Sequence, residues 1–155
     1  MKKSKKASNQ DIIDQLCTAY GMEIETVQNY IANSVHLDGV RSDVIKKALA
    51  ADVTEEVGHA QQLAQRIKTI GGKVPGSLDL KPKQKYLQPP KDTTDVVAVI
   101  KGVIAAEEAA ITQYQKIIKT CDGRDYVTQD LVITILGSEE EHRREFLGFL
   151  KEYAG

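Results

Sequence analysis

The chain has 155 residues, 41% of them hydrophobic and 28% charged, a composition typical of one globular domain that can bury a core. A formal net charge of −1 excludes a strong overall field that would attract nucleic acid or an anionic membrane. Every apolar run is far shorter than the roughly 20 residues of a membrane-spanning helix, and no apolar segment follows the basic start of the chain, so we expect a cytoplasmic protein without membrane contact.

Residues 1–8 are expected to form a flexible basic tail, and residues 9–155 a single helical domain. The tail is too polar to pack against a core, and it carries Lys2, Lys3, Lys5 and Lys6. Such a tail can contact DNA phosphates through counterion release. The alternative is a terminus that only improves solubility and has no partner.

The first predicted helix begins after Ser8 and Asn9, which are good N-capping residues, and runs to about Leu37. Gly39 then ends it. Apolar residues recur along it at helical spacing and are expected to face the core: Ile13, Leu16, Tyr20, Ile24, Val27 and Ile31.

The second predicted helix is capped by Ser42 or Asp43 and is terminated by Gly71 and Gly72. Its apolar stripe has the same helical period and consists of Ile45, Leu49, Val53, Ala60, Leu63, Ile67 and Ile70.

The third predicted helix follows the polar cap 92–95 and runs to about Cys121, although the β-branched stretch 96–100 also fits a strand. Gly123 separates it from the fourth helix, which covers about 125–153. Four helices of similar length result.

The connection 73–91 holds all four prolines and is therefore expected to be non-helical. Short turns at Gly39 and Gly123 make the helices that they join antiparallel. About 20 extended residues reach roughly 65 Å, whereas a 28-residue helix is roughly 42 Å long. The sequence thus predicts an all-α four-helix bundle with one long crossover connection between parallel helices 2 and 3.

The two cysteines, Cys17 and Cys121, lie far apart in the sequence and show no metal-ligand spacing. Two cysteines cannot form the dense framework of a small secreted domain, so we expect free thiols.

Two Glu-x-x-His motifs are the strongest functional signal. Glu56 stands three positions before His59, and Glu139 three positions before His142. Residues at this spacing share one helix face and can bind one metal ion. One match can be accidental, but two matches among three histidines are far rarer. Both motifs have the helical phase of the apolar stripes, so their side chains point into the core. Burying these Glu and His side chains without a partner would cost several kcal/mol.

Each remaining helix contributes one more glutamate in the apolar phase, Glu23 in the first helix and Glu107 in the third. Residues at the same height in an antiparallel hairpin have their sequence midpoint in the turn. The midpoint of Glu23 and Glu56 is 39.5, at the first turn glycine. The midpoint of Glu107 and Glu139 is 123, at the second. Each hairpin therefore brings two Glu and one His to one height.

The two hairpins form an internal pseudo-repeat that includes Tyr30 and Tyr114, each seven positions after its glutamate. These phenols can hydrogen-bond a ligand carboxylate or donate an electron during oxidation. The alternative is a pair of core tyrosines with satisfied hydroxyls.

Four carboxylates and two neutral imidazoles balance the charge of two divalent ions. The mixed oxygen and nitrogen ligands suit iron or manganese, and zinc can also occupy such a site. Glutamates on two helices with Glu-x-x-His motifs on the other two are the di-iron carboxylate pattern of helical bundles.

At these residues the chain resembles the ferritin-like superfamily, most closely bacterioferritins and Dps-like miniferritins. The stretch EEVGHAQQLAQRIKTIGG is similar to their second helix, and AAEEAAITQYQKIIKTCDGRDYVTQDLVITILGSEEEH to their third and fourth. The resemblance implies a ferroxidase that binds two iron ions per subunit, with Glu56 and Glu139 bridging and the other four residues terminal. It also implies O2 or H2O2 as oxidant and a ferric mineral stored in a homo-oligomeric shell.

Two departures narrow this expectation. Val57 stands where bacterioferritins carry a haem-ligating Met, so no haem is expected. The chain ends 13 residues after His142, too soon for the fifth helix of 24-subunit shells, which favours a 12-mer over a 24-mer. Two other functions stay open: a rubrerythrin-like peroxidase without storage, although the cysteine-rich domain of rubrerythrins is absent, and a DNA-protecting structural protein that acts through Lys2 to Lys6.

Several further residues are candidates of lower rank. Glu108 is the alternative to Glu107. His36 lines an iron entry path, lies at a subunit contact, or is an ordinary surface histidine. The remaining acidic neighbours of the motifs are expected to be solvated or to contact the ligand side chains without binding the metal themselves: Glu55, Glu140 and Glu141.

Overall fold

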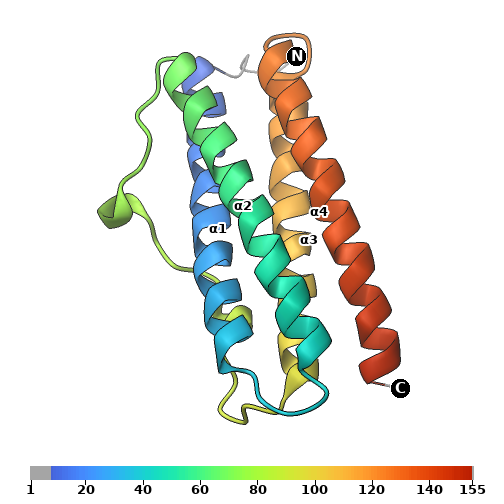
Figure 1. The fold of residues 1–155 in the computed structure, drawn as a ribbon. Helices are drawn as coiled ribbons and strands as arrows, with labels where there is room; N and C mark the ends of the chain where they lie inside the picture. Colours follow the sequence, from blue (N-terminus) through green and yellow to red (C-terminus); the bar gives the residue numbers. More distant parts are fainter. Residues whose placement is uncertain (1–7, 155) are drawn as a thin grey trace, which may run out of the picture.

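The computed structural model describes residues 8–154, and four helices make up most of them (Figure 1). The helices are α1 (Asn9–His36), α2 (Asp43–Thr69), α3 (Val96–Cys121) and α4 (Tyr126–Tyr153). No strand occurs between residues 8 and 154, so the predicted all-α class is confirmed, and the ambiguous stretch 96–100 is the first turn of α3. The lysines of the basic tail lie outside the described residues.

Side-chain caps fix where three of the helices begin. The hydroxyl of Ser8 accepts a hydrogen bond from the N–H of Asp11, whose carboxylate accepts the N–H of Ser8 in return. Asp95 and Asp125 cap α3 and α4 in the same way, each accepting an N–H three residues further on. The predicted helix starts are therefore correct to within about one residue.

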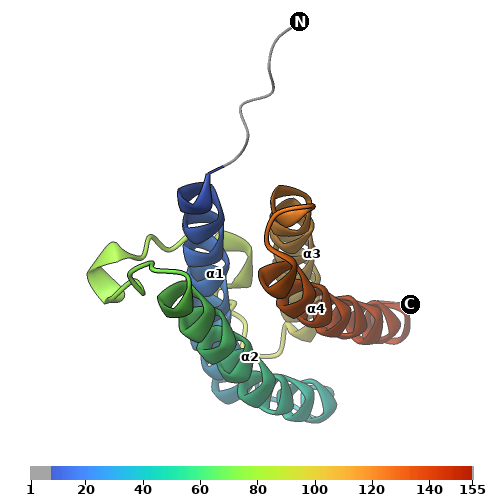
Figure 2. The same ribbon diagram turned by 90° about the horizontal axis from the view of Figure 1, so that it is seen from above.

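The two short turns are formed by glycines in the left-handed region, with φ of +91° at Gly39 and +69° at Gly123. Each turn joins two antiparallel helices, and the two hairpins lie side by side, with α1 also packed against α3 (Figure 2). Helices α2 and α3 run in the same direction (Figure 1).

The connection between α2 and α3 runs along the outside of α1 from one end of the bundle to the other (Figure 1), as predicted for a crossover. It contains only two short 3-10 turns, η1 (Ser77–Asp79) and η2 (Lys85–Leu87). Buried side chains of α1 hold it. Asn29 donates a hydrogen bond to Gln84 at 2.9 Å, and Asn33 donates one to the carbonyl of Leu87 at 2.9 Å.

This contact corrects the predicted core face of α1. Ile31 was expected inside but is 48% exposed, and the buried face in that part of the helix is polar, with Thr26, Asn29 and Asn33. These three side chains form hydrogen bonds with the connection or the backbone, so they can be buried at low cost, and the apolar stripe turns outward.

The apolar core is divided into two parts. One cluster includes Leu16, Leu63 and Ile117, and the other includes Leu49 and Phe146. Along every helix, the charged residues of the two motifs and their partners lie between these clusters. The fold therefore surrounds a charged centre with apolar layers on both sides.

Both cysteines are free thiols, as expected. Cys17 contacts the carbonyl of Lys73 through its sulfur at 3.7 Å, and burial raises the pKa of Cys121 to about 11. His36 lies 2.9 Å from the carbonyl of Pro90, a contact that ties α1 to the end of the connection.

Among residues 8–154, no helix is long and apolar enough to cross a membrane.

Candidate metal centre

The six predicted ligands meet in the middle of the bundle. Helices α1 and α3 supply one glutamate each, and α2 and α4 supply one Glu-x-x-His motif each. All six side chains are almost completely buried, at exposed fractions of 0–6%: Glu23, Glu56, His59, Glu107, Glu139 and His142. Of the two candidates on α3, Glu107 lies in the centre, whereas Glu108 is exposed.

The six side chains form two sets of four ligand atoms, and within each set the atoms lie within 4.8 Å of one another. Glu56 and Glu139 belong to both sets. One set is completed by Glu23 and His59 and the other by Glu107 and His142. Two shared carboxylates between two sets are the arrangement expected of a dinuclear centre with two bridging ligands.

Both imidazoles face the carboxylates through Nδ1. Nδ1 of His59 lies 3.0 Å from Glu56 and 2.9 Å from Glu139. Nδ1 of His142 lies 3.1 Å from Glu56, 3.5 Å from Glu139 and 3.6 Å from Glu107. The two rings are 6.5 Å apart between centroids. Nδ1 is thus the nitrogen available for a metal ion in both motifs.

Unpaired buried atoms show that these residues fit a metal. Oε1 of Glu56, Oε1 of Glu139 and Nδ1 of His142 are buried, yet none of them makes an aligned hydrogen bond. The short nitrogen to oxygen distances around them are therefore close approaches without hydrogen-bond geometry. Buried polar atoms without partners are costly, and a shared cation satisfies several of them at once.

The two tyrosines of the pseudo-repeat reach across the hairpins. The hydroxyl of Tyr30 on α1 donates to Glu107 on α3 at 2.5 Å. The hydroxyl of Tyr114 on α3 donates to Glu23 on α1 in a very short hydrogen bond. Each phenol therefore contacts, in the opposite hairpin, the glutamate that belongs to only one of the two ligand sets.

Burial and close charges shift the pKa values of these residues when no metal is bound. Burial and neighbouring carboxylates raise the pKa of Glu23 and Glu107 well above the ordinary range. Burial opposes ionisation of Glu56 as well, but the adjacent Glu23, His142 and His59 lower its pKa. Burial likewise opposes the charged form of His59, and the close carboxylates of Glu139 and Glu56 raise its pKa to about 9. The centre therefore holds protons that a bound metal would have to displace.

Comparison with known proteins agrees with this geometry. The ferritin-like domain profile matches residues 13–154. The chain belongs to the ferritin-like domain family.

Relatives of this ferritin-like chain include the DNA protection during starvation protein of Pyrococcus furiosus, 27% identical over 87% of this chain and 74% of that protein. The bacterial ferritin of Neisseria meningitidis is 26% identical over 90% of this chain and 85% of that protein.

Solved structures show the same fold. The bacterioferritin-related protein of Bacteroides fragilis, a dodecameric thioferritin, superposes with a TM-score of 0.82 at 29% identity, over 96% of this chain and 89% of that one. A ferritin-like, diiron-carboxylate protein of Bacillus anthracis superposes with a TM-score of 0.78 at 22% identity, over 96% of this chain and 99% of that one.

Asp52 of this ferritin-like chain was not predicted from the sequence. Asp52 is buried on α2, and its Oδ1 lies 3.6 Å from Nε2 of His142. Glu55 was expected to support the ligands or to be solvated, and its carboxylate lies 2.8 Å from the same nitrogen. Asp52 stands four positions before Glu56, a spacing of one helical turn, which was the only available signal.

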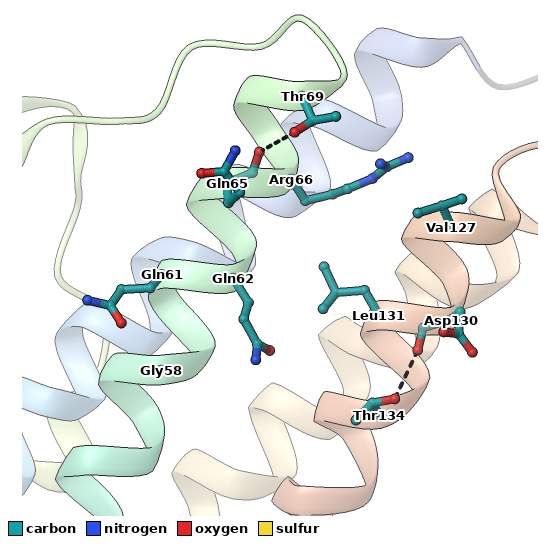
Figure 3. A pocket seen from close by; sticks show the side chains of 10 residues that line it. All are labelled: Gly58, Gln61, Gln62, Gln65, Arg66, Thr69, Val127, Asp130, Leu131 and Thr134. Carbon is teal, nitrogen blue, oxygen red and sulfur yellow. Dashed lines mark hydrogen bonds between the residues drawn. The ribbon is translucent and has the colours of Figure 1, made fainter.

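An open groove of about 810 Å³ lies between α2 and α4, near the turn that joins α3 to α4 (Figure 3). The side chain of Arg66 reaches across it toward α4, where it donates hydrogen bonds to Thr128 at 2.8 Å and to Asp125 at 3.0 Å. None of the six predicted ligands lines this groove. The cluster of six candidate ligands is a separate, buried site.

Proposed function

We propose that this ferritin-like protein is a cytoplasmic ferroxidase that binds two Fe2+ ions as substrate, oxidises them with O2 or H2O2, and deposits the ferric product inside a homo-oligomeric shell. The observation that carries the proposal is the pair of buried four-ligand sets sharing Glu56 and Glu139.

In this proposal the two shared glutamates bridge the ions. Glu23 and His59 complete one half of the centre, and Glu107 and His142 complete the other. Two adjacent Fe2+ ions supply two electrons together, which reduce H2O2 and two protons to two water molecules, or O2 and two protons to H2O2. Buried carboxylates keep the pair in place and exclude bulk water from it.

Tyr30 and Tyr114 hold the terminal glutamates through their hydroxyl groups, which supports a positioning role beside the metal centre. Electron donation from these phenols during oxidation is the second role proposed for them. Haem has no part in the proposal, because Val57 stands at the position of the haem-ligating Met of bacterioferritins.

Aerobic oxidation of Fe2+ tests the reaction, followed by the rise of ferric absorbance. Glu107→Gln removes one carboxylate of the centre and is expected to slow oxidation by at least about tenfold, as for loss of a metal ligand. Glu108→Gln removes the neighbouring exposed carboxylate and should oxidise iron at the wild-type rate. Equal rates for both variants and the wild type would contradict the proposed centre.

Storage is tested by the iron that remains bound after aerobic loading and gel filtration. A storage shell retains many ferric ions per subunit, whereas a rubrerythrin-like peroxidase retains only the two of its centre. Two irons per subunit in the wild type would replace the storage proposal with the peroxidase one.

The proposed shell is a 12-mer, because the similar protein of Bacteroides fragilis is dodecameric. Twelve chains of 17.1 kDa give about 205 kDa, which static light scattering separates from a dimer and from a 24-mer.

DNA protection is a second candidate, favoured by the name of the Pyrococcus furiosus relative. It would act through the lysines of the basic tail. A gel shift that weakens with salt and disappears on deletion of residues 1–7, which keeps the N-cap Ser8, would support it, and a shift unchanged by that deletion would exclude this tail.

A further inference from the structure

Two carboxylates of α2 lie behind one of the two histidines of the centre. Glu55 is 2.8 Å from Nε2 of His142, and Oδ1 of Asp52 is 3.6 Å from the same nitrogen. Asp52 is only 6% exposed, and its second oxygen, Oδ2, has no hydrogen-bond partner. A buried carboxylate and a half-exposed one therefore face the outer nitrogen of this imidazole.

His59, the other histidine of the centre, has no such pair of carboxylates behind it, as a comparison of the two hairpins shows. An offset of 83 positions relates Glu56 to Glu139 and His59 to His142. The same offset relates the acidic pair of α2 to Ile135 and Ser138 on α4, neither of which is ionisable. Within residues 8–154, the ion-pair contacts of the His59 ring are all made by Nδ1.

We propose that Asp52 and Glu55 are positioning residues that make the two halves of the metal centre unequal, so that the half containing His142 binds a divalent cation more tightly than the half containing His59. This inference rests on the proposed dinuclear centre and adds an order of filling to it.

The physical basis is the hydrogen bond behind the ligand. A carboxylate that accepts the Nε2–H of His142 fixes the proton on that nitrogen and leaves the lone pair of Nδ1 toward the metal. The same hydrogen bond makes Nδ1 a stronger base and a better ligand. The negative charge of the half-exposed Glu55 also attracts a cation, weakened by solvent screening.

Another interpretation uses the same atoms. One oxygen of each carboxylate and a nitrogen of His142 lie within 4.8 Å of one another, close enough to hold an additional ion. In the dinuclear centre, however, His142 presents Nδ1 to the shared carboxylates, and its Nε2 then carries the proton that Glu55 accepts. The number of ions bound per subunit separates the two interpretations.

Calorimetric titration of the chelator-treated, assembled protein with Co2+ tests the proposal without oxidation. The wild type should bind two Co2+ per subunit in two resolved steps. Asp52→Asn and Glu55→Gln, singly and combined, should weaken the tighter step, by about 10–100-fold in the double variant, and leave the weaker step and the count of two unchanged. A purely structural disturbance would weaken both steps, because both halves share Glu56 and Glu139.

Glu140→Gln is the matched control. Glu140 is exposed and follows Glu139 directly, just as Glu55 directly precedes Glu56, so this variant removes one charge equally close in sequence to a bridging ligand. It should leave both steps at wild-type affinity.

Two equal steps in the wild type, equal weakening of both steps, or unchanged affinities in the double variant would overturn the inference alone. A third Co2+ that the double variant loses would show that the pair is itself a metal site and would also overturn it. Fewer than two Co2+ per subunit in the wild type would contradict the dinuclear centre of the proposed function as well.

Discussion

Each tyrosine of the pseudo-repeat ends on a glutamate of the opposite hairpin, so the two hairpins are linked at the height of the metal centre. Tyr114 and Glu23 are both buried, and neither can replace the lost partner with bulk water. Removal of one hydroxyl therefore leaves a buried carboxyl with one partner fewer.

Tyr114→Phe is expected to lower the free energy of unfolding by about 1–2 kcal/mol and to slow Fe2+ oxidation while two metal ions still bind. Tyr153→Phe is the matched control, since Tyr153 is a half-buried tyrosine at the end of α4, 11 residues beyond His142. Chemical denaturation, Fe2+ oxidation and Co2+ titration of both variants measure these effects. A Tyr114→Phe protein as stable as the control would count against the cross-hairpin link.

Metal binding should release protons from the centre. In the metal-free centre, burial keeps the pKa of Glu23 and Glu107 raised, and the close carboxylates hold that of His59 near 9 and raise that of His142. Metal ligands must be carboxylates and neutral imidazoles. Loading two divalent ions at pH 7 should therefore release protons.

A pH indicator in weakly buffered protein measures this release during addition of Co2+. Mg2+, which dehydrates reluctantly and favours oxygen ligands, serves as the control ion. Saturation with Co2+ without release of protons would show that the centre is already deprotonated.

The six residues that form the two four-ligand sets could be predicted from the sequence alone. Their inward orientation and their common height across each turn both follow from their positions along the chain. Spacing did not identify Asp52, because its partner is the outer nitrogen of a histidine on another helix. The direction of a ring nitrogen depends on a rotamer, which the sequence pattern does not contain.

At the scale of elements, the helices and turns followed from caps, glycines and prolines, whereas the buried face of α1 did not. Hydrophobic periodicity placed Ile31 inside, but Asn29 and Asn33 occupy the interior because the connection supplies their hydrogen-bond partners. Hydrophobic periodicity detects only an apolar buried face. A polar face that is buried by a loop shows no such periodicity in the sequence.

The connection also constrains α3. A Cβ on Gly102 would lie 2.4 Å from the carbonyl oxygen of Tyr86, which is backbone and cannot rotate away. Gly102→Ala is therefore expected to destabilise the protein by about 1–3 kcal/mol, the usual cost of overpacking.

Gly148→Ala tests the same change without the steric conflict. Gly148 lies within α4, and a Cβ there meets nothing within 4 Å. Alanine should stabilise this helix by about 1 kcal/mol through its higher helix propensity. Denaturation midpoints of the two variants that shift in the same direction would contradict the close approach of the connection to α3.

For the whole molecule, the long connection fixes the parallel arrangement of α2 and α3, which loop lengths alone predicted correctly (Figure 1). The arrangement places the two Glu-x-x-His helices and the two single-glutamate helices around one centre. Stability of the whole bundle is therefore coupled to the charge state of that centre.

Metal-free protein should lose stability as the pH rises from about 6.5 to about 9. The folded-state pKa of His59, about 9, exceeds its ordinary value of 6.5, so the stabilising proton is fully present below pH 6.5 and is lost through pH 9. The expected fall is on the order of 2 kcal/mol, or roughly 4–8 °C in Tm for a chain of this length.

Thermal unfolding at fixed protein concentration measures this dependence, with Co2+-loaded protein as the reference. The loaded protein should have the higher Tm and should lack this component of the pH dependence, because a metal-bound imidazole carries no proton on its ligating nitrogen. Equal Tm values for the two forms would contradict a buried metal centre.

The most direct measurement is a crystal structure of protein soaked anaerobically in Fe2+, with anomalous differences collected at the iron edge. Two iron peaks per subunit are expected, both between Glu56 and Glu139, with His59 beside one and His142 beside the other. A single peak, or peaks only in the groove between α2 and α4, would contradict a dinuclear centre.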